Sequence, residues 1–225
     1  MAMKVCTDAC LLGAWATVGA GGRLLDIGTG TGLLALMAAQ RNPAAQIDAV
    51  ELDEAAAEQA RQNVANSPFA TQVRIHQTPV QTYLAHVPDP VYHHILTNPP
   101  FFVNSLRSPD EALNRALHTD ELPFAELLTA VVRLLKPGGT WSVMLPPAEA
   151  AQLAALATAA GLVPVRHLFL RHNAQKPVFR HLTTYLNAHD VPGPVTPEML
   201  CLYEVGSRTY TPQFRQLLAP FYLMF

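Results

Sequence analysis

Leu24-Leu25-Asp26-Ile27-Gly28-Thr29-Gly30-Thr31-Gly32 is the stretch of sequence that decides the fold class of this protein. Its first half is short and mostly apolar, a pattern that predicts a buried strand. Glycines then follow at every second position, and a glycine can adopt the positive φ that a tight turn requires. Apolar side chains recur at helical spacing over residues 33–40. A strand, a glycine turn and a helix in this order predict an α/β protein whose backbone meets a nucleotide-like ligand at the turn.

The spacing of Gly28, Gly30 and Gly32 distinguishes between two kinds of nucleotide site. Dinucleotide-binding turns have the pattern G-x-G-x-x-G, whereas this chain has an acid, Asp26, followed by G-x-G-x-G. This pattern resembles motif I of the class I S-adenosylmethionine (SAM) methyltransferases. The resemblance implies that the loop accommodates the amino-acid part of SAM and that Asp26 accepts hydrogen bonds from its ammonium group. The alternative is a tight turn between strand and helix that binds nothing.

A second acid is expected beside the glycine turn. Residues 46–51 have the pattern of a strand, and Glu51 stands at its carboxyl end, the side on which open α/β sheets bind ligands. A carboxylate there can accept two strong hydrogen bonds from a ribose diol; the alternative is a solvated loop residue. Related enzymes carry an acid after the third strand, but residues 77–80 contain none. We therefore expect a neighbouring amide to hold the adenine of SAM; the alternative is a weaker affinity for SAM.

The fourth strand, residues 91–97, ends in Asn98-Pro99-Pro100-Phe101. This sequence resembles motif IV of methyltransferases that modify planar amino nitrogens. Such a nitrogen is a poor nucleophile because its lone pair is delocalised; two acceptors, the Asn98 side-chain oxygen and the Pro99 carbonyl, can take its N–H groups and redirect the lone pair. The prolines stiffen the loop, and Phe101 can stack on the base. The four residues are the predicted catalytic group, with a rigid turn as the alternative.

Composition limits the other possibilities. The chain has 225 residues, of which 50% are hydrophobic, and a formal net charge of −2. It is therefore expected to form one domain over residues 1–225, without a global field that attracts nucleic acid. Three cysteines without framework spacing favour a reducing cytoplasm, and no metal site is expected from them. No apolar run is long enough to span a membrane.

The remaining pattern predicts how the domain is completed. Residues 1–20 form an N-terminal helical segment, helices are expected near residues 123–135 and 148–160, and a strand over residues 141–145. Residues 163–171 and 178–186 are predicted to form a hairpin, residues 190–197 a surface loop, and the apolar residues 214–225 a packed tail. Alternating strands and helices followed by a hairpin predict an α/β fold with a mostly parallel sheet, helices on both faces and an antiparallel edge.

The chain as a whole is similar to the bacterial tRNA(Val) (adenine-37-N6)-methyltransferases. The matching residues are Met3-Lys4-Val5, Thr7-Asp8, 11–16, 26–39, 48–52, 98–101, Arg115 with Ala116 and His118, and 221–225. The resemblance implies a Rossmann-like, seven-stranded sheet, transfer of a methyl group from SAM to N6 of an adenine in tRNA, S-adenosylhomocysteine as product, no metal and no obligate protein partner. The implied cofactor-binding residues are Thr7, Asp8, Asp26, Gly28, Gly30, Gly32, Glu51, Leu52 and Asn98.

The substrate surface is expected to be a local patch. Residues 150–189 contain no Asp or Glu, and a hairpin that carries only cations is a plausible surface for phosphates. The predicted RNA-contacting residues are Arg107, Arg115, Arg166, Arg171, Lys176 and Arg180. A basic, solvated sheet edge is the alternative.

Two other functions stay open. Release-factor methyltransferases, which modify the N5 of a glutamine, also use Asn-Pro-Pro-aromatic on a planar amide, although they resemble this chain less at both ends. A SAM-binding module that contacts RNA without turnover is the third possibility, because of the missing acid near Pro79 and the short N-terminal segment.

Overall fold

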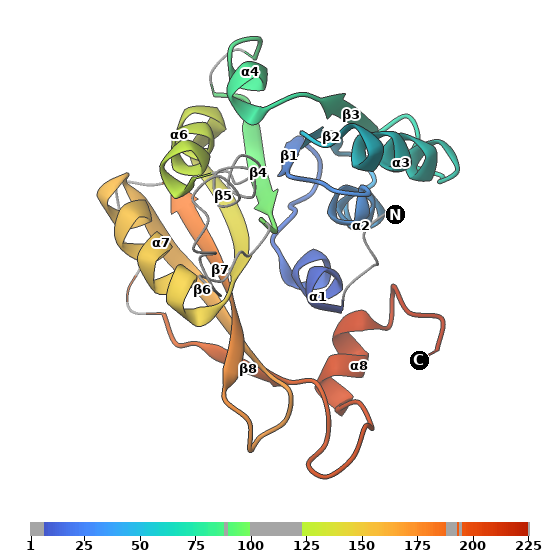
Figure 1. The fold of residues 1–225 in the computed structure, drawn as a ribbon, viewed down its shortest axis with the longest axis vertical. Helices are drawn as coiled ribbons and strands as arrows, with labels where there is room; N and C mark the ends of the chain where they lie inside the picture. The colour runs from blue at the N-terminus through green and yellow to red at the C-terminus, as the bar shows by residue number, and fades with distance from the viewer. Residues whose placement is uncertain (1–6, 88–89, 100–122, 188–192, 194, 225) are drawn as a thin grey trace, which may run out of the picture.

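The computed structural model describes residues 7–87, 90–99, 123–187, 193 and 195–224. Its helices are α1 (Thr7–Trp15), α2 (Leu33–Arg41), α3 (Glu54–Ala65), α4 (Val80–Leu84), α6 (Phe124–Leu134), α7 (Pro147–Ala159) and α8 (Pro212–Leu218). Its strands are β1 (Arg23–Ile27), β2 (Gln46–Glu51), β3 (Val73–Gln77), β4 (Tyr92–Thr97), β5 (Leu135–Leu145), β6 (Leu162–Arg171), β7 (Val178–Asn187) and β8 (Glu198–Cys201). Strands and helices alternate along the described chain up to β6 (Figure 1).

The strands form one mixed sheet in the order β3-β2-β1-β4-β5-β7-β6-β8. The pairs from β3 to β5 are parallel, while β7 is antiparallel to both β5 and β6. The chain reverses its strand order on passing from β3 to β4, and this switch point is where open α/β sheets bind ligands. The predicted parallel sheet and antiparallel hairpin are confirmed.

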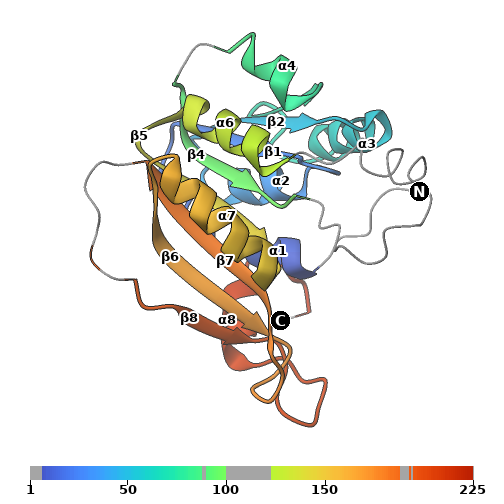
Figure 2. The same cartoon turned by 60° about the vertical axis from the view of Figure 1, so that its left-hand side comes forward.

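Two hydrophobic cores sandwich the sheet. One core contains Leu11 and Leu12 of α1, the inward face of α2, and Phe214 of α8. The other contains the apolar faces of α6 and α7 together with residues of the central strands, including Trp141, which is fully buried. Figures 1 and 2 show α6 and α7 on one side of the sheet and α1 and α2 on the other. Burial of both sheet faces explains why the central strands are so apolar.

The sheet has eight strands in the part of the chain that the structure describes, and the expected number of seven is wrong. The additional strand is β8, whose four residues pair in parallel with β6. So short a strand has no recognisable sequence pattern of its own, because it is stabilised by its neighbour. Its proline-rich approach was correctly expected to be irregular over residues 195–197.

The C-terminal segment packs as expected up to Tyr222. The Thr211 hydroxyl caps α8 by accepting from the Phe214 N–H at 3.2 Å, and Phe214 stacks on Tyr210 with ring centroids 4.4 Å apart. The expectation is wrong for Leu223 and Met224, which are exposed. Among the described residues, no helix has the length and apolar character needed to cross a membrane.

Candidate active site

The strand register brings three predicted site segments to one edge of the sheet. Ile27 of β1 is paired with Val50 of β2 on one side and with Thr97 of β4 on the other. Gly28, Glu51 and Asn98 follow these residues, so all three lie at the carboxyl ends of adjacent parallel strands. Neighbouring strands are about 4.8 Å apart, and the glycine loop and the Asn98 corner are therefore immediate neighbours.

The glycine loop is held by backbone contacts. Gly28, Gly30 and Gly32 have φ values of 73°, 57° and 86°, which only glycine adopts without strain. The N–H groups of Gly28 and Thr29 both donate to the Val50 carbonyl, at 2.9 and 3.1 Å. A side chain at Gly28 would meet no atom within 4 Å. The loop therefore presents bare backbone to open space at the sheet edge.

Asp26 lies beneath this loop and is 1% exposed. Its Oδ2 accepts from the Thr29 hydroxyl at 2.6 Å and from the Ala35 N–H, in the first turn of α2, at 3.1 Å. Its Oδ1 is buried and has no partner among the described residues. Burial raises the pKa of Asp26 to about 7, although these two hydrogen bonds act in the opposite direction. A cationic ligand group at Oδ1 would satisfy the free oxygen and stabilise the carboxylate.

Glu51 connects the end of β2 to the glycine loop. Its Oε2 accepts from the Gly30 N–H at 2.7 Å, and its Oε1 accepts from the Asp53 N–H at 2.9 Å. Each carboxylate oxygen keeps a further lone pair for a ligand hydroxyl. Leu52 is exposed beside it, and the Gln77 amide donates to the Leu52 carbonyl at 3.1 Å. Gln77 is thus an amide at the position where the sequence lacks an acid.

Asn98 follows the buried end of β4. The Thr97 hydroxyl accepts from the Trp141 indole N–H at 3.1 Å, which fixes the strand end against β5. The side-chain oxygen of Asn98 is buried and, within the described residues, has no hydrogen-bond partner. An unpaired buried acceptor costs folding free energy, so this oxygen, next to the open glycine loop, is available to a donor from a ligand. Pro99 is buried beside it.

Several predicted residues lie outside the described residues. These are Pro100 and Phe101 of the Asn98 corner, and Arg107 and Arg115 of the segment that follows it. Their predicted roles stay predictions.

Thr7 and Asp8 begin α1. Asp8 pairs with Arg180 at the start of β7, with 3.1 Å between Oδ2 and Nε. Arg180 directly precedes His181, which is paired with the last residue of β5, so Asp8 lies toward the carboxyl edge of the sheet. The Thr7 side chain hydrogen-bonds to the Tyr222 hydroxyl. Both side chains have protein partners at the edge where the cofactor is expected.

The predicted cations of the hairpin fall into two groups. Arg166 stacks on the Trp15 ring at 4.4 Å and pairs with Glu198 at 3.1 Å, and Arg180 pairs with Asp8; both therefore face α1. Arg171 ends β6, where it donates to the Ala174 carbonyl at 3.5 Å, and Lys176 is exposed in the hairpin turn. Only the second pair lies at the tip of the hairpin.

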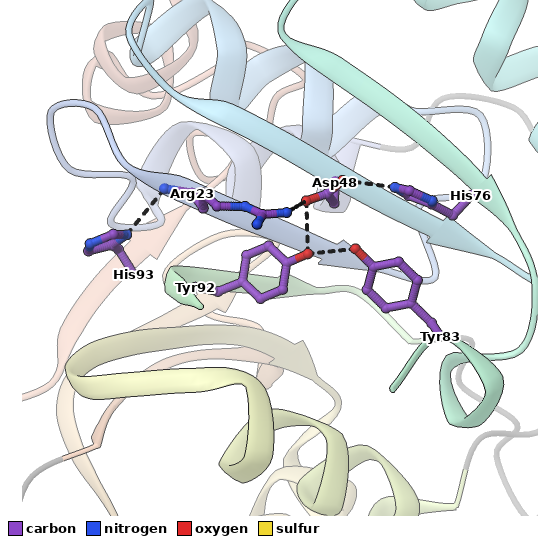
Figure 3. A network of polar contacts seen from close by, with 6 residues as sticks. All are labelled: Arg23, Asp48, His76, Tyr83, Tyr92 and His93. Atoms are coloured by element: carbon purple, nitrogen blue, oxygen red, sulfur yellow. Dashed lines mark hydrogen bonds and ion pairs between the residues drawn. The ribbon is translucent and has the colours of Figure 1, made fainter. Parts of the chain in front are cut away.

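A polar network lies at the opposite, amino end of the sheet (Figure 3). Asp48 accepts from Arg23 at 2.6 Å and from the Tyr92 hydroxyl at 2.8 Å, and it contacts the His76 ring nitrogen at 2.8 Å. Burial raises the pKa of Asp48, but the hydrogen bonds from His76, Arg23 and Tyr92 outweigh burial and lower it to about 2. A cavity of about 690 Å³ adjoins this network, lined in part by Arg61, and it is remote from the Asn98 corner. The network joins β1, β2, β3 and β4.

The sequence analysis did not single out three residues that support the glycine loop or the polar network, namely Thr29, Asn63 and Asp48. Thr29 was part of the quoted loop, and its spacing of three residues from Asp26 could have suggested the hydrogen bond. Asn63 of α3, whose amide donates to the Thr31 carbonyl at 2.9 Å, and Asp48 gave no local signal, because their partners are distant in sequence.

The donor set fits SAM. A cation can pair with the free Asp26 oxygen, a diol can bind Glu51, and the bare loop at Gly28 leaves room for a ligand close to the backbone. Together with the strand order and the Asn98 corner, these features define a class I, SAM-dependent methyltransferase.

Comparison with known proteins agrees with this class. Residues 8–152 match the family model described as methyltransferase small domain. The tRNA1(Val) (adenine(37)-N6)-methyltransferase of Dyadobacter fermentans is 46% identical over 100% of this chain and 92% of its own length. The corresponding enzyme of Tolumonas auensis is 43% identical, covering 99% and 91%. A solved structure described as a predicted O-methyltransferase from Agrobacterium tumefaciens has a TM-score of 0.70 at 22% identity, covering 94% of this chain and 95% of that chain, and supports the fold. The chain belongs to the tRNA1(Val) (adenine(37)-N6)-methyltransferase family.

Proposed function

We propose that this chain transfers the methyl group of SAM to the N6 amino nitrogen of an adenine in tRNA, at position 37 of a valine tRNA as the names of its relatives state. The observation that carries the proposal is the buried oxygen of Asn98, which has no hydrogen-bond partner in the part of the chain that the structure describes. It lies on the strand next to the glycine loop, where an acceptor base and a methyl donor can meet.

The roles of the residues follow from their hydrogen-bonding capacity. The exocyclic amine of adenine has two N–H groups and a delocalised lone pair. The Asn98 oxygen and the Pro99 carbonyl accept these two N–H groups, since neither can donate there. This pairing draws the nitrogen toward a tetrahedral geometry and exposes its lone pair. Positioning by two acceptors in a buried corner supplies the rate advantage.

The cofactor side is organised by carboxylates. SAM, when bound, supplies an electrophilic methyl group on a sulfonium with a good leaving group. Asp26 would pair with its ammonium group, and Glu51 would accept from its ribose hydroxyls. No strong general base is required, because the amine becomes acidic once it carries the additional methyl group. The proton can then leave to solvent.

Methyl transfer to a defined RNA tests this proposal. The substrate is an unmodified transcript of valine tRNA with labelled SAM, and the matched control is the same transcript with inosine in place of the target adenosine. We expect label in the first RNA and none in the second, with N6-methyladenosine as the modified nucleoside. Equal label in both transcripts, or label in a protein glutamine instead of RNA, would overturn the proposal.

A further inference from the structure

A row of side chains crosses the carboxyl half of the hairpin on one face of the sheet. The register pairs Leu145 of β5 with His181 of β7, His181 with Phe169 of β6, and Phe169 with Met199 of β8. Paired residues project from the same face, and Leu145 belongs to the core under α6 and α7. We call Leu145, His181, Phe169 and Met199 the stacking row.

The row becomes more exposed toward the edge of the sheet. Leu145 is 2% exposed and Met199 is 49% exposed, while His181 and Phe169 are half-buried between them. In Figure 2 the carboxyl end of β6 and the neighbouring β8 lie clear of α7. The row therefore forms a graded surface that begins in the core and ends in solvent.

The rings of the row are already arranged for stacking. Phe169 and His181 have ring centroids 4.1 Å apart and planes inclined by 28°, and the His167 centroid is 6.0 Å from Phe169. Burial lowers the pKa of both His167 and His181, which favours neutral rings. A half-buried pair of stacked rings of this kind can extend its stack with a nucleobase of any sequence.

The row is continuous with the Asn98 corner. Thr97 is paired with Val143, and Val143 with Thr183, so His181 lies two strands away from β4 near the same edge. Two strand spacings of about 4.8 Å place it about 10 Å from the corner. This is the distance at which nucleotides next to a base held at Asn98 would lie.

The charges around the row suit RNA. Residues 150–189 contain no carboxylate, and Glu198 of β8 is paired with Leu168 in the register and reaches Arg166 on the opposite face. Arg171 and Lys176 lie at the hairpin tip beyond the row. A surface with stacking rings, nearby cations and no acid from its own hairpin matches single-stranded RNA better than an acidic or apolar partner.

We propose that the stacking row binds the unpaired nucleotides beside the target adenine in the tRNA loop. This inference rests on the proposed function, since it assigns the substrate surface of the same site. Arg166 and Arg180, two of the cations predicted to contact RNA, face α1. The proposal therefore assigns the RNA contact of the hairpin to aromatic rings on the other face of the sheet. Phe169 and His181 are then binding residues rather than catalytic residues.

The chain offers a matched pair of variants for the test. Phe169→Leu removes the ring from the row, while Phe179→Leu removes a half-buried ring from the same hairpin that stacks on His172 at 4.2 Å and packs against the core on the α1 side. We expect Phe169→Leu to raise KM for tRNA about 10-fold or more, with kcat and SAM affinity unchanged. Phe179→Leu should leave KM for tRNA unchanged, and Phe169→Trp should retain binding.

A second variant and a binding assay keep this inference separate from the proposed function. Met199→Ser shortens an exposed apolar side chain and is expected to weaken RNA binding about threefold to tenfold, through lost apolar contact area, without lowering the Tm. Anisotropy with a labelled anticodon stem-loop RNA measures binding without methyl transfer. If the wild type binds this RNA and Phe169→Leu binds it more weakly, the result would support RNA binding by the stacking row even if no methyl transfer occurred. If methyl transfer occurs and the KM for tRNA is the same in Phe169→Leu, Met199→Ser and Phe179→Leu, the stacking row does not bind the RNA. The proposed function would remain intact.

Discussion

Replacing Asn98 with alanine should make the protein less active and no less stable. The Asn98 oxygen is buried without a partner among the described residues, and such a group costs about 1–3 kcal/mol of folding free energy. Alanine removes this cost and leaves a small space, for which we allow about 1 kcal/mol. The free energy of unfolding should therefore stay equal or rise by up to about 2 kcal/mol, which is up to about 8 °C in Tm.

The effect on turnover should have the opposite sign. Removal of one preorganised hydrogen-bonding group from an active site lowers kcat about 100- to 1,000-fold. SAM affinity should change far less, because the side chain acts on the acceptor base. Single-turnover methyl transfer measures the chemical step, calorimetry measures SAM binding, and thermal denaturation measures stability.

Asn42 provides the control. It is 2% exposed, its oxygen accepts from the Gly21 N–H at 2.6 Å, and its amide donates to the Val18 and Gly21 carbonyls at 2.7 and 3.0 Å. Asn42→Ala loses three hydrogen bonds, which should lower the free energy of unfolding by about 3 kcal/mol. Its kcat should equal that of the wild type at temperatures below the Tm of the variant. The reasoning is refuted if Asn98→Ala is destabilised as much as Asn42→Ala while kcat is retained.

Three further predictions concern the loop and the two buried acids. Gly28→Ala and Gly138→Ala should each lower the free energy of unfolding by about 1–2 kcal/mol, because both glycines have φ of 73° and open surroundings. Only Gly28→Ala should weaken SAM binding, as measured by calorimetry. The folded pKa of Asp26, about 7, exceeds its ordinary value of 3.8, so the free energy of unfolding of the wild type should fall as pH rises from about 4 to 7. Asp26→Asn should remove this decrease, which is on the order of 4 kcal/mol, in urea denaturation at a series of pH values. The same decrease in Asp26→Asn as in the wild type would contradict the prediction. Asp48 has a folded pKa of about 2, so Asp48→Asn should lose on the order of 2 kcal/mol above about pH 4, and the difference from wild type should shrink as pH falls toward 2.

The parallel half of the fold and the site edge could be predicted from sequence because their signals are local. Asp26, the glycines, Glu51 and Asn98 lie at or directly after the end of a strand whose apolar run is visible in the chain. Parallel strands place such ends at one edge by topology alone. The placement of Gly28 and Asn98 at one edge therefore needed no knowledge of side-chain packing, whereas the pairing of β1 with β4 is seen only in the structure.

The hairpin surface could not be predicted in the same way. Which face a strand residue takes depends on an unbroken alternation, and the pairing of β6 with β7 shifts between Pro164 and Arg166 and again between Leu170 and Arg171. The four cations therefore looked equivalent in sequence although they are not equivalent in space. The Asp48 network had no sequence pattern because its members come from four separate strands.

The contact between Thr7 and Tyr222 has a consequence for how the chain is synthesised. These residues are about 215 positions apart, and a ribosome adding 5–20 residues per second needs about 10–40 s to span them. During that time the buried residues of α1, Leu11 and Leu12, lack their final cover from α8 and the tail. This surface of α1 is therefore expected to stay exposed until α8 and residues 221–222 have emerged from the exit tunnel.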